Sequence, residues 1–192
     1  AVDSNVVDLI AQDIDDLLDE WYVRCVGSEA APYLEKYYAH WEDFWTRRIL
    51  DSAWWKDRGQ YLRFNDPGYL ADVTEEDMKL SRGWLEAAFE QAGTEKHRAR
   101  AKLLLHAFEY YEASWIAYHQ SATTGDMTIQ TELDALECIE RAERAAAMAQ
   151  KRLALVEQYE QHPVLNHPLP PSRYQKLQGK NWGAAQLGRV TD

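Results

Sequence analysis

Residues 101–122 read AKLLLHAFEYYEASWIAYHQSA and carry the most regular apolar pattern in the chain. Apolar side chains return there after alternating steps of three and four residues, a spacing that keeps them on one face of an α-helix. The positions of this stripe are Ala101, Leu104, Phe108, Tyr111, Trp115, Tyr118 and Ala122. The pattern predicts a long central helix that begins near Thr94.

Four further segments show helical spacing and surround the central helix in the sequence. An acidic amphipathic segment, residues 4–26, ends before Gly27, which suits the left-handed residue that follows many helices. Residues 28–49 carry a wide aromatic stripe, and residues 74–93 and 128–160 continue the helical period. We therefore expect an all-α fold, an antiparallel bundle of about five main helices.

The same spacing predicts the inward face of the first and last helices. In the first helix the predicted inward positions are Val6, Ile10, Ile14, Leu17, Trp21 and Cys25. In the last helix they are Leu133, Leu136, Cys138, Ala142, Ala145, Ala149, Leu153 and Val156. The two cysteines of the chain both lie on these stripes, and we interpret them as structural thiols.

Tryptophan is unusually frequent, with eight residues in a chain of 192. Indole rings at helical spacing are usually core residues, and five are expected in the core: Trp21, Trp41, Trp45, Trp84 and Trp115. The aromatic stripe of residues 28–49 must be covered by other helices or by a partner. Trp41 and Trp45 are therefore also candidates for an interface, for example with a second copy of the chain.

Residues 51–73 interrupt the helical period and contain several turn-forming residues. We expect a long ordered loop there, held to the bundle by its aromatic side chains. Flat aromatic rings can also stack on sugar rings. Trp54, Trp55 and Tyr61 are therefore candidates for a sugar-binding platform on this loop.

The C-terminal segment has a different composition from the rest. Four prolines follow His162 within ten residues and forbid a continuous helix, and glycines in a polar setting come after them. We expect a helical domain over residues 1–161 and an extended tail or linker over residues 162–192. Trp182 and Leu187 are apolar enough for this tail to pack back on the bundle.

Charge and hydropathy exclude several classes of function. The chain carries 32 acidic and 21 basic residues, a net charge of −11, so its field repels the phosphate backbone of nucleic acids. No apolar run approaches the ~20 residues of a membrane span. Residues 1–20 lack the pattern of a signal peptide, so the chain itself indicates no compartment.

Sequence signatures of catalytic chemistry are missing. The sequence contains no CxxC, HExxH or phosphate-binding glycine loop, and no glutamate has a histidine three residues later. Carboxylate pairs are abundant, but 32 acidic residues produce such pairs at any helical spacing. We assign no catalytic residue, no metal ligand and no cofactor.

Part of the pattern resembles a known family. Leu17-Leu18-Asp19-Glu20-Trp21-Tyr22, then Gly27, Ala30-Ala31-Pro32-Tyr33-Leu34 and Tyr37-Tyr38, with Arg98 and Arg100 later, resemble the helical region that follows the catalytic barrel in bacterial glycoside-hydrolase-like proteins of largely unknown function. Those proteins are similar in layout to hexosaminidases and to alpha-glucuronidases. The resemblance covers residues 7–159 and carries over no catalytic residue.

The resemblance implies a non-catalytic accessory domain of a larger carbohydrate-active protein. Its partner would be an upstream catalytic domain, which the domain would support at the barrel or at its substrate cleft, with a glycan as ligand. By analogy the location would be extracellular or periplasmic. The alternative from the residues themselves is a free-standing interaction module that forms a homodimer. A small independent enzyme is the third interpretation.

Overall fold

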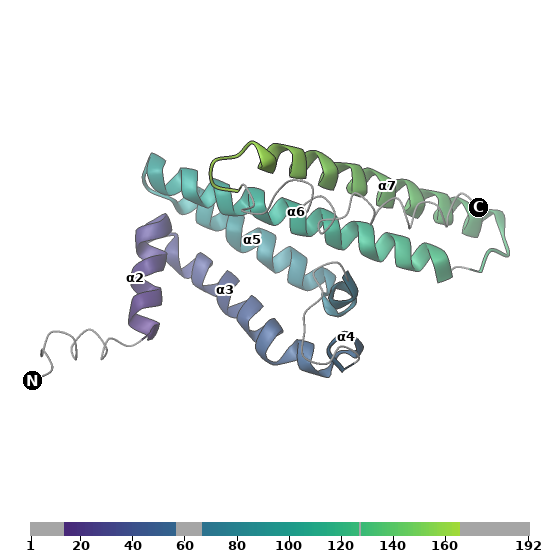
Figure 1. Cartoon of the computed structure of the whole chain (residues 1–192), viewed down its shortest axis with the longest axis horizontal. Helices are drawn as coiled ribbons and strands as arrows, with labels where there is room; N and C mark the ends of the chain where they lie inside the picture. Colours follow the sequence, from purple (N-terminus) through teal and green to yellow (C-terminus); the bar gives the residue numbers. More distant parts are fainter. Residues whose placement is uncertain (1–13, 57–66, 127, 166–192) are drawn as a thin grey trace, which may run out of the picture. The chain divides into compact units, whose positions relative to one another are not determined.

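Figure 1 shows the computed structural model of the chain, which describes residues 14–56, 67–126 and 128–165. Every regular element in these ranges is a helix, so the predicted all-α fold is confirmed. Five long helices dominate the described ranges, in agreement with the number expected. They are α2 (Ile14–Val26), α3 (Ala31–Thr46), α5 (Glu75–Gln91), α6 (Glu95–Asp126) and α7 (Glu132–Glu160).

The chain divides into two compact units. Unit 1 consists of Ala1–Thr46 and Glu76–His106, and unit 2 consists of Arg47–Glu75 and Ala107–Asp192. Of the described helices, unit 1 holds α2, α3 and nearly all of α5, while unit 2 holds α7. The long helix α6 contributes its first part to unit 1 and the remainder to unit 2.

Gly27 forms the joint between α2 and α3. Its φ of +94° lies in the left-handed region, as the sequence predicts, and its N–H donates to the Val23 carbonyl oxygen at 2.9 Å. Its own carbonyl accepts the Ala31 N–H at 2.9 Å, so this one residue ends a helix and begins the next. The Arg100 guanidinium, from the start of α6, donates to the Arg24 carbonyl at 2.5 Å and neutralises the carbonyl end of α2.

Helices α3 and α5 of unit 1 run side by side in opposite directions (Figure 1). The Trp41 indole N–H donates to Ser81 Oγ at 3.0 Å, and His40 Nε2 lies 2.8 Å from Asp77 Oδ1. Asp77 is buried, and a buried carboxylate is stable only with such a partner. The fully buried apolar side chains of this unit include Val26, Leu34, Phe44 and Leu85.

The described residues of the predicted long loop, residues 51–73, contain short helices, and the first of these begins just before that segment. They are η1 (Arg48–Asp51), α4 (Ala53–Lys56) and η2 (Pro67–Asp72). Ser52 initiates α4 because its Oγ accepts the Trp55 N–H at 3.0 Å, the arrangement of a helix N-cap. Elements of one or two turns are too short to produce an apolar period, which is why the sequence pattern did not reveal them.

Polar contacts from α6 hold η2 within unit 2. The Trp115 indole N–H donates to the Val73 carbonyl at 2.8 Å, and His119 Nε2 lies 2.8 Å from the Leu70 carbonyl. The Val73 carbonyl directly follows the short helix, and the Leu70 carbonyl lies within it and also accepts the Val73 N–H at 3.2 Å. The aromatic anchoring expected for residues 51–73 is therefore supplied in part by rings of the central helix.

Helix α7 begins at Glu132, a few residues after the predicted start at Thr128. Thr131 Oγ1 accepts the Asp134 N–H at 3.1 Å, and the Asp134 carboxylate accepts the Thr131 N–H at 2.8 Å. This capping box sets the start of the helix. The backbone N–H groups of Gln130 and Thr131 that bind this carboxylate also lower the pKa of Asp134. Helix α7 then runs back along the second part of α6, with its Tyr159 ring beside Tyr110 (Figure 1).

Several side chains predicted to face the core are exposed. Trp21 and Trp45 are 43% and 40% exposed. The other exposed members of the predicted inward faces are Ile14, Leu17, Leu133 and Leu136. Helix α2 instead buries Tyr22 and Val26, a face rotated by one residue, or about 100°, from the predicted stripe. Apolar spacing identifies a face of a helix, but the neighbouring helices decide which edge of it is covered.

The remaining predictions have mixed outcomes. Trp41 is buried as predicted, whereas Trp84 and Trp115 are half-buried. Both cysteines are free thiols and half-buried. Val6 and Ile10, together with most of the predicted tail over residues 162–192, lie outside the described residues.

Candidate functional site

A surface groove lies between α2 and α3 in unit 1. Its volume is about 640 Å³, within the range typical of ligand-binding pockets. Its described lining residues are Leu18, Trp21 and Tyr22 of α2, and Tyr38, Trp41, Glu42 and Trp45 of α3. The lining is mostly apolar, and we refer to this feature as the α2–α3 groove.

Helical spacing explains why these residues meet. The four from α3 follow one another at steps of three, one and three residues, so they share one face of that helix. The three from α2 likewise lie within one turn. Because the joint at Gly27 turns the chain back within four residues, the two faces are placed against each other.

Contacts among the aromatic rings fix the shape of the groove. Trp21 packs edge-on against Tyr38, with ring centroids 5.5 Å apart, and Tyr22 lies 6.1 Å from the same ring. Trp41 is held by its hydrogen bond to Ser81 on α5. The floor of the groove is therefore buried and anchored, while Trp21 and Trp45 form exposed walls.

The charged groups in and near the groove that act on its phenols include carboxylates. Glu42 is the one carboxylate among its described lining residues, and its side chain is exposed. The pKa of the Tyr22 phenol is raised, first by burial and then by the nearby carboxylates of Glu35, Glu42 and Asp19. Burial also raises the pKa of Tyr38. Both phenols stay neutral at physiological pH, so the carboxylates determine the sign of the charge here.

The structure brings both predicted interface residues into this groove. Trp41 contributes to its floor and Trp45 to one wall, although the role of an interface remains a prediction. Sequence reasoning assigned Trp21 to the core and did not single out Tyr38 or Glu42. The spacing of Tyr38, Trp41, Glu42 and Trp45 on one helical face was a signal that could have connected them.

The predicted sugar platform is not assembled from three exposed rings. Trp54 is only 9% exposed and packs edge-on against Tyr69, with ring centroids 5.7 Å apart. Trp55 is 41% exposed, and Tyr61 lies outside the described residues. Burial of Trp54 follows from the single turn of α4, which directs adjacent side chains about 100° apart, one inward and one to solvent.

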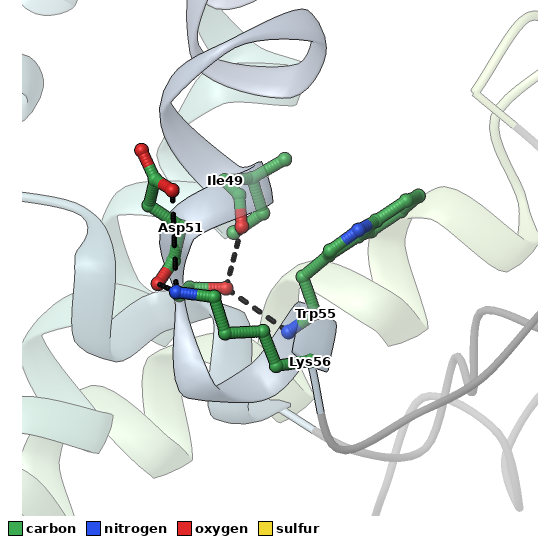
Figure 2. Close-up of polar contacts among 5 residues, drawn as sticks. Ile49, Asp51, Trp55 and Lys56 are labelled. Atoms are coloured by element: carbon green, nitrogen blue, oxygen red, sulfur yellow. Dashed lines mark hydrogen bonds and ion pairs between the residues drawn. The ribbon is translucent and has the colours of Figure 1, made fainter.

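Figure 2 shows the polar contacts that support Trp55. The Lys56 ammonium donates to the Asp51 carbonyl at 2.7 Å and lies 4.0 Å from the Asp51 carboxylate. Ser52 Oγ bridges the two short helices by donating to the Ile49 carbonyl at 2.6 Å and accepting the Trp55 N–H. The Trp55 ring points away from Asp51 and Lys56, so neither of these charged side chains lies beside it.

Unit 2 contains a cluster of tyrosines around a buried arginine. The Arg152 guanidinium donates to the Tyr110 hydroxyl at 3.2 Å and lies 5.3 Å from the centre of that ring. Tyr69 stacks parallel to Tyr111, with ring centroids 6.4 Å apart. Burial raises the pKa of Tyr69 to about 12, an effect that Tyr110 increases and Arg152 reduces. Because these groups bind one another, we interpret the cluster as structural.

The raised pKa of Tyr69 predicts how stability changes at alkaline pH. Between the unfolded value of 10.0 and the folded value of about 12, the unfolded chain loses this proton while the folded chain keeps it. Stability should therefore be full below pH 10 and should fall as the pH rises toward 12. Replacing Tyr69 by Phe should make this fall shallower.

Urea unfolding followed by circular dichroism at a series of alkaline pH values measures this effect. The original chain and the Tyr69→Phe variant should show parallel stability curves near pH 8 and should diverge above pH 10. Curves that stay parallel throughout the alkaline range would show that Tyr69 ionises with the same pKa in both states.

Within residues 14–56, 67–126 and 128–165, no group of three or more His, Cys, Asp or Glu side chains is arranged to hold a metal ion. In the same ranges no helix combines the length and the apolar character that crossing a bilayer requires.

The α2–α3 groove is therefore the candidate site that described residues of unit 1 form. Comparison of the chain with known proteins finds no relative. No family model matches its sequence, and no curated protein or solved structure matches it.

Proposed function

We propose that this chain is a non-catalytic helical interaction module, and that its α2–α3 groove holds an amphipathic helix of a partner protein. The groove itself carries this proposal: an open, mostly apolar depression with anchored aromatic rings at its floor and exposed indoles at its walls. Proteins commonly bind an amphipathic helix by accepting its apolar face in such a groove.

The exposed surface of α2 extends the apolar area beyond the groove. Ile14 and Leu17 are exposed on this helix, next to the groove-lining residues Leu18 and Trp21. Soluble proteins rarely leave a contiguous apolar surface of this kind uncovered unless it binds something. The length of this surface along the helix favours an elongated occupant over a compact small molecule.

Charge complementarity favours a basic occupant. The polar side of α2 carries Asp15, Asp16, Asp19 and Glu20, and the chain as a whole has a net charge of −11. A partner helix with apolar residues on one face and Lys or Arg along its edges would match both the apolar and the acidic surfaces. An acidic or strongly anionic partner would be repelled.

The accessory role implied by the family resemblance is a special case of this proposal. In that case the partner is the catalytic domain of the same carbohydrate-active protein, and the groove forms a contact between domains. A homodimer would place a second copy on the same surface. A glycan stacked on the indole rings is a further alternative occupant. The experiment below separates these outcomes.

The first test uses a synthetic peptide of about 18 residues, five turns of helix, with Leu on one face and Lys along the edges. A peptide of identical composition but scrambled order, without an apolar face, serves as its control. Binding is measured by titration calorimetry and by tryptophan fluorescence. We expect the amphipathic peptide to bind at least ~10-fold more tightly than the scrambled one.

Matched variants locate the bound peptide. Trp45→Ala should weaken binding by at least ~10-fold, as loss of an interface tryptophan typically does, while Trp55→Ala removes an equally exposed indole from unit 2 and should leave binding unchanged. Equal binding of the two peptides, or equal effects of the two variants, would refute the proposal. If the chain self-associates and Trp45→Ala abolishes the association, the occupant of the groove is a second copy of the chain. If the chain binds a glycan and Trp45→Ala abolishes that binding, the occupant is a glycan.

A further inference from the structure

We propose that the α2–α3 groove selects an arginine side chain of its bound helix, by pairing the guanidinium with Glu42 and stacking it on the exposed indole of Trp45. This inference rests on the proposed function, because it names the residue type that the same groove recognises. It follows from the placement of one carboxylate within an otherwise aromatic surface.

Glu42 has aromatic neighbours on both sides along α3. Tyr38 precedes it by four residues and Trp45 follows it by three, so both rings lie one turn away on the same face. Trp21 lines the groove from α2. Among the residues that the structure describes, no basic side chain forms an ion pair with the Glu42 carboxylate. The carboxylate is thus available to a cation from a partner.

A carboxylate beside aromatic rings is suited to an organic cation. The ring faces attract positive charge, so a cation bound there contacts both the carboxylate and an aromatic ring. Asp19 and Glu35 are close enough to raise the pKa of Tyr22, so they add negative potential without lining the groove. All of these groups favour a cation over a neutral or anionic side chain.

The geometry favours arginine over lysine. A guanidinium is planar, so it can stack on an indole face while its N–H groups bind both oxygens of a carboxylate. It is also less strongly hydrated than an ammonium ion, which makes its transfer into an apolar groove easier. Lysine could form the ion pair but not the stacked arrangement.

The test compares peptides that differ at a single edge position. Four versions of the amphipathic peptide carry Arg, Lys, Gln or Glu there, and the substituted position is moved along the edge in successive sets. At one position we expect the Arg peptide to bind about 10-fold more tightly than the Gln peptide and about 3-fold more tightly than the Lys peptide. The Glu peptide should bind most weakly.

Glu42→Gln should remove the preference for Arg, so that the Arg and Gln peptides bind this variant with affinities within about 2-fold of each other. Glu90→Gln provides the matched control, since Glu90 is an exposed residue of α5 in the same unit and does not line the groove. It makes the same change in net charge and should retain the preference. Circular dichroism confirms that both variants are folded.

The outcomes distinguish this inference from the proposed function. If the Gln peptide binds the groove but Arg gives no advantage, the selection of arginine is refuted and the interaction module stands. If the preference survives Glu42→Gln, or if Glu90→Gln reduces it equally, the effect is one of general charge and the inference is also refuted. If no peptide binds, both the inference and the proposed function fail.

Discussion

Replacing Phe44 by alanine is expected to lower the free energy of unfolding by about 3–5 kcal/mol, the largest effect of any substitution considered. Phe44 lies on α3 and is 0% exposed. Its ring is held edge-on between Trp41 and Trp45, at centroid distances of 5.5 Å and 5.2 Å. Removal of the ring leaves a cavity that Trp41, held by its hydrogen bond to Ser81, cannot easily fill.

The adjacent residue provides the control. Trp45→Ala removes a larger side chain from the same helix, but 40% of that side chain is already in water, so we expect a smaller loss of about 1–2 kcal/mol. Urea unfolding followed by circular dichroism measures both variants. A loss for Trp45→Ala as large as that for Phe44→Ala would show that Trp45 is a core residue, and it would remove one wall from the proposed groove.

This pair of residues shows how far sequence reasoning reaches. Both lie on the aromatic stripe of residues 28–49, whose helical spacing predicts the helix correctly. The pattern cannot distinguish Phe44 from Trp45, because exposure depends on which edges of α3 are covered by α2 and α5. That information resides in how the helices pack against one another in three dimensions.

The site illustrates the same limit. Trp41 and Trp45 were predicted as interface candidates because the wide aromatic stripe of their helix must be covered by other helices or by a partner. Trp21 was predicted as a core residue but forms an exposed wall of the groove. The buried face of α2 is rotated by one residue from the predicted face, and the sequence pattern does not reveal this rotation. Local signals with a stereochemical origin were more reliable: the left-handed Gly27 was predicted directly.

The sequence pattern made no prediction for the buried Arg152, for a related reason. Arg152 lies on the same face of α7 as the buried Ala149 and Val156, yet an arginine within an apolar stripe is normally taken as solvated. Its burial requires Tyr110, whose hydroxyl and ring both accept it. Because that partner comes from α6, only the three-dimensional structure reveals the pair.

The second large effect is expected at the joint between α2 and α3. Gly27→Ala places a side chain on a residue with φ of +94°, a conformation that costs a residue other than glycine about 1–3 kcal/mol. The new Cβ would also lie 2.9 Å from Nδ1 of His97, so the imidazole must move. We expect the free energy of unfolding to fall by about 2–3 kcal/mol in total.

Two further variants separate these causes. Gly83→Ala is the matched control: Gly83 lies inside α5, nothing lies within 4 Å of its new Cβ, and the substitution should stabilise the chain by about 0.5–1 kcal/mol. His97→Ala combined with Gly27→Ala should recover only the part due to the close contact. Full recovery of stability in that double variant would show that the backbone conformation at Gly27 is not strained. A loss of stability in Gly83→Ala equal to that in Gly27→Ala would show that neither cause is specific to the joint. Since the α2–α3 groove depends on this joint, Gly27→Ala should also weaken peptide binding under conditions where Gly83→Ala leaves it unchanged.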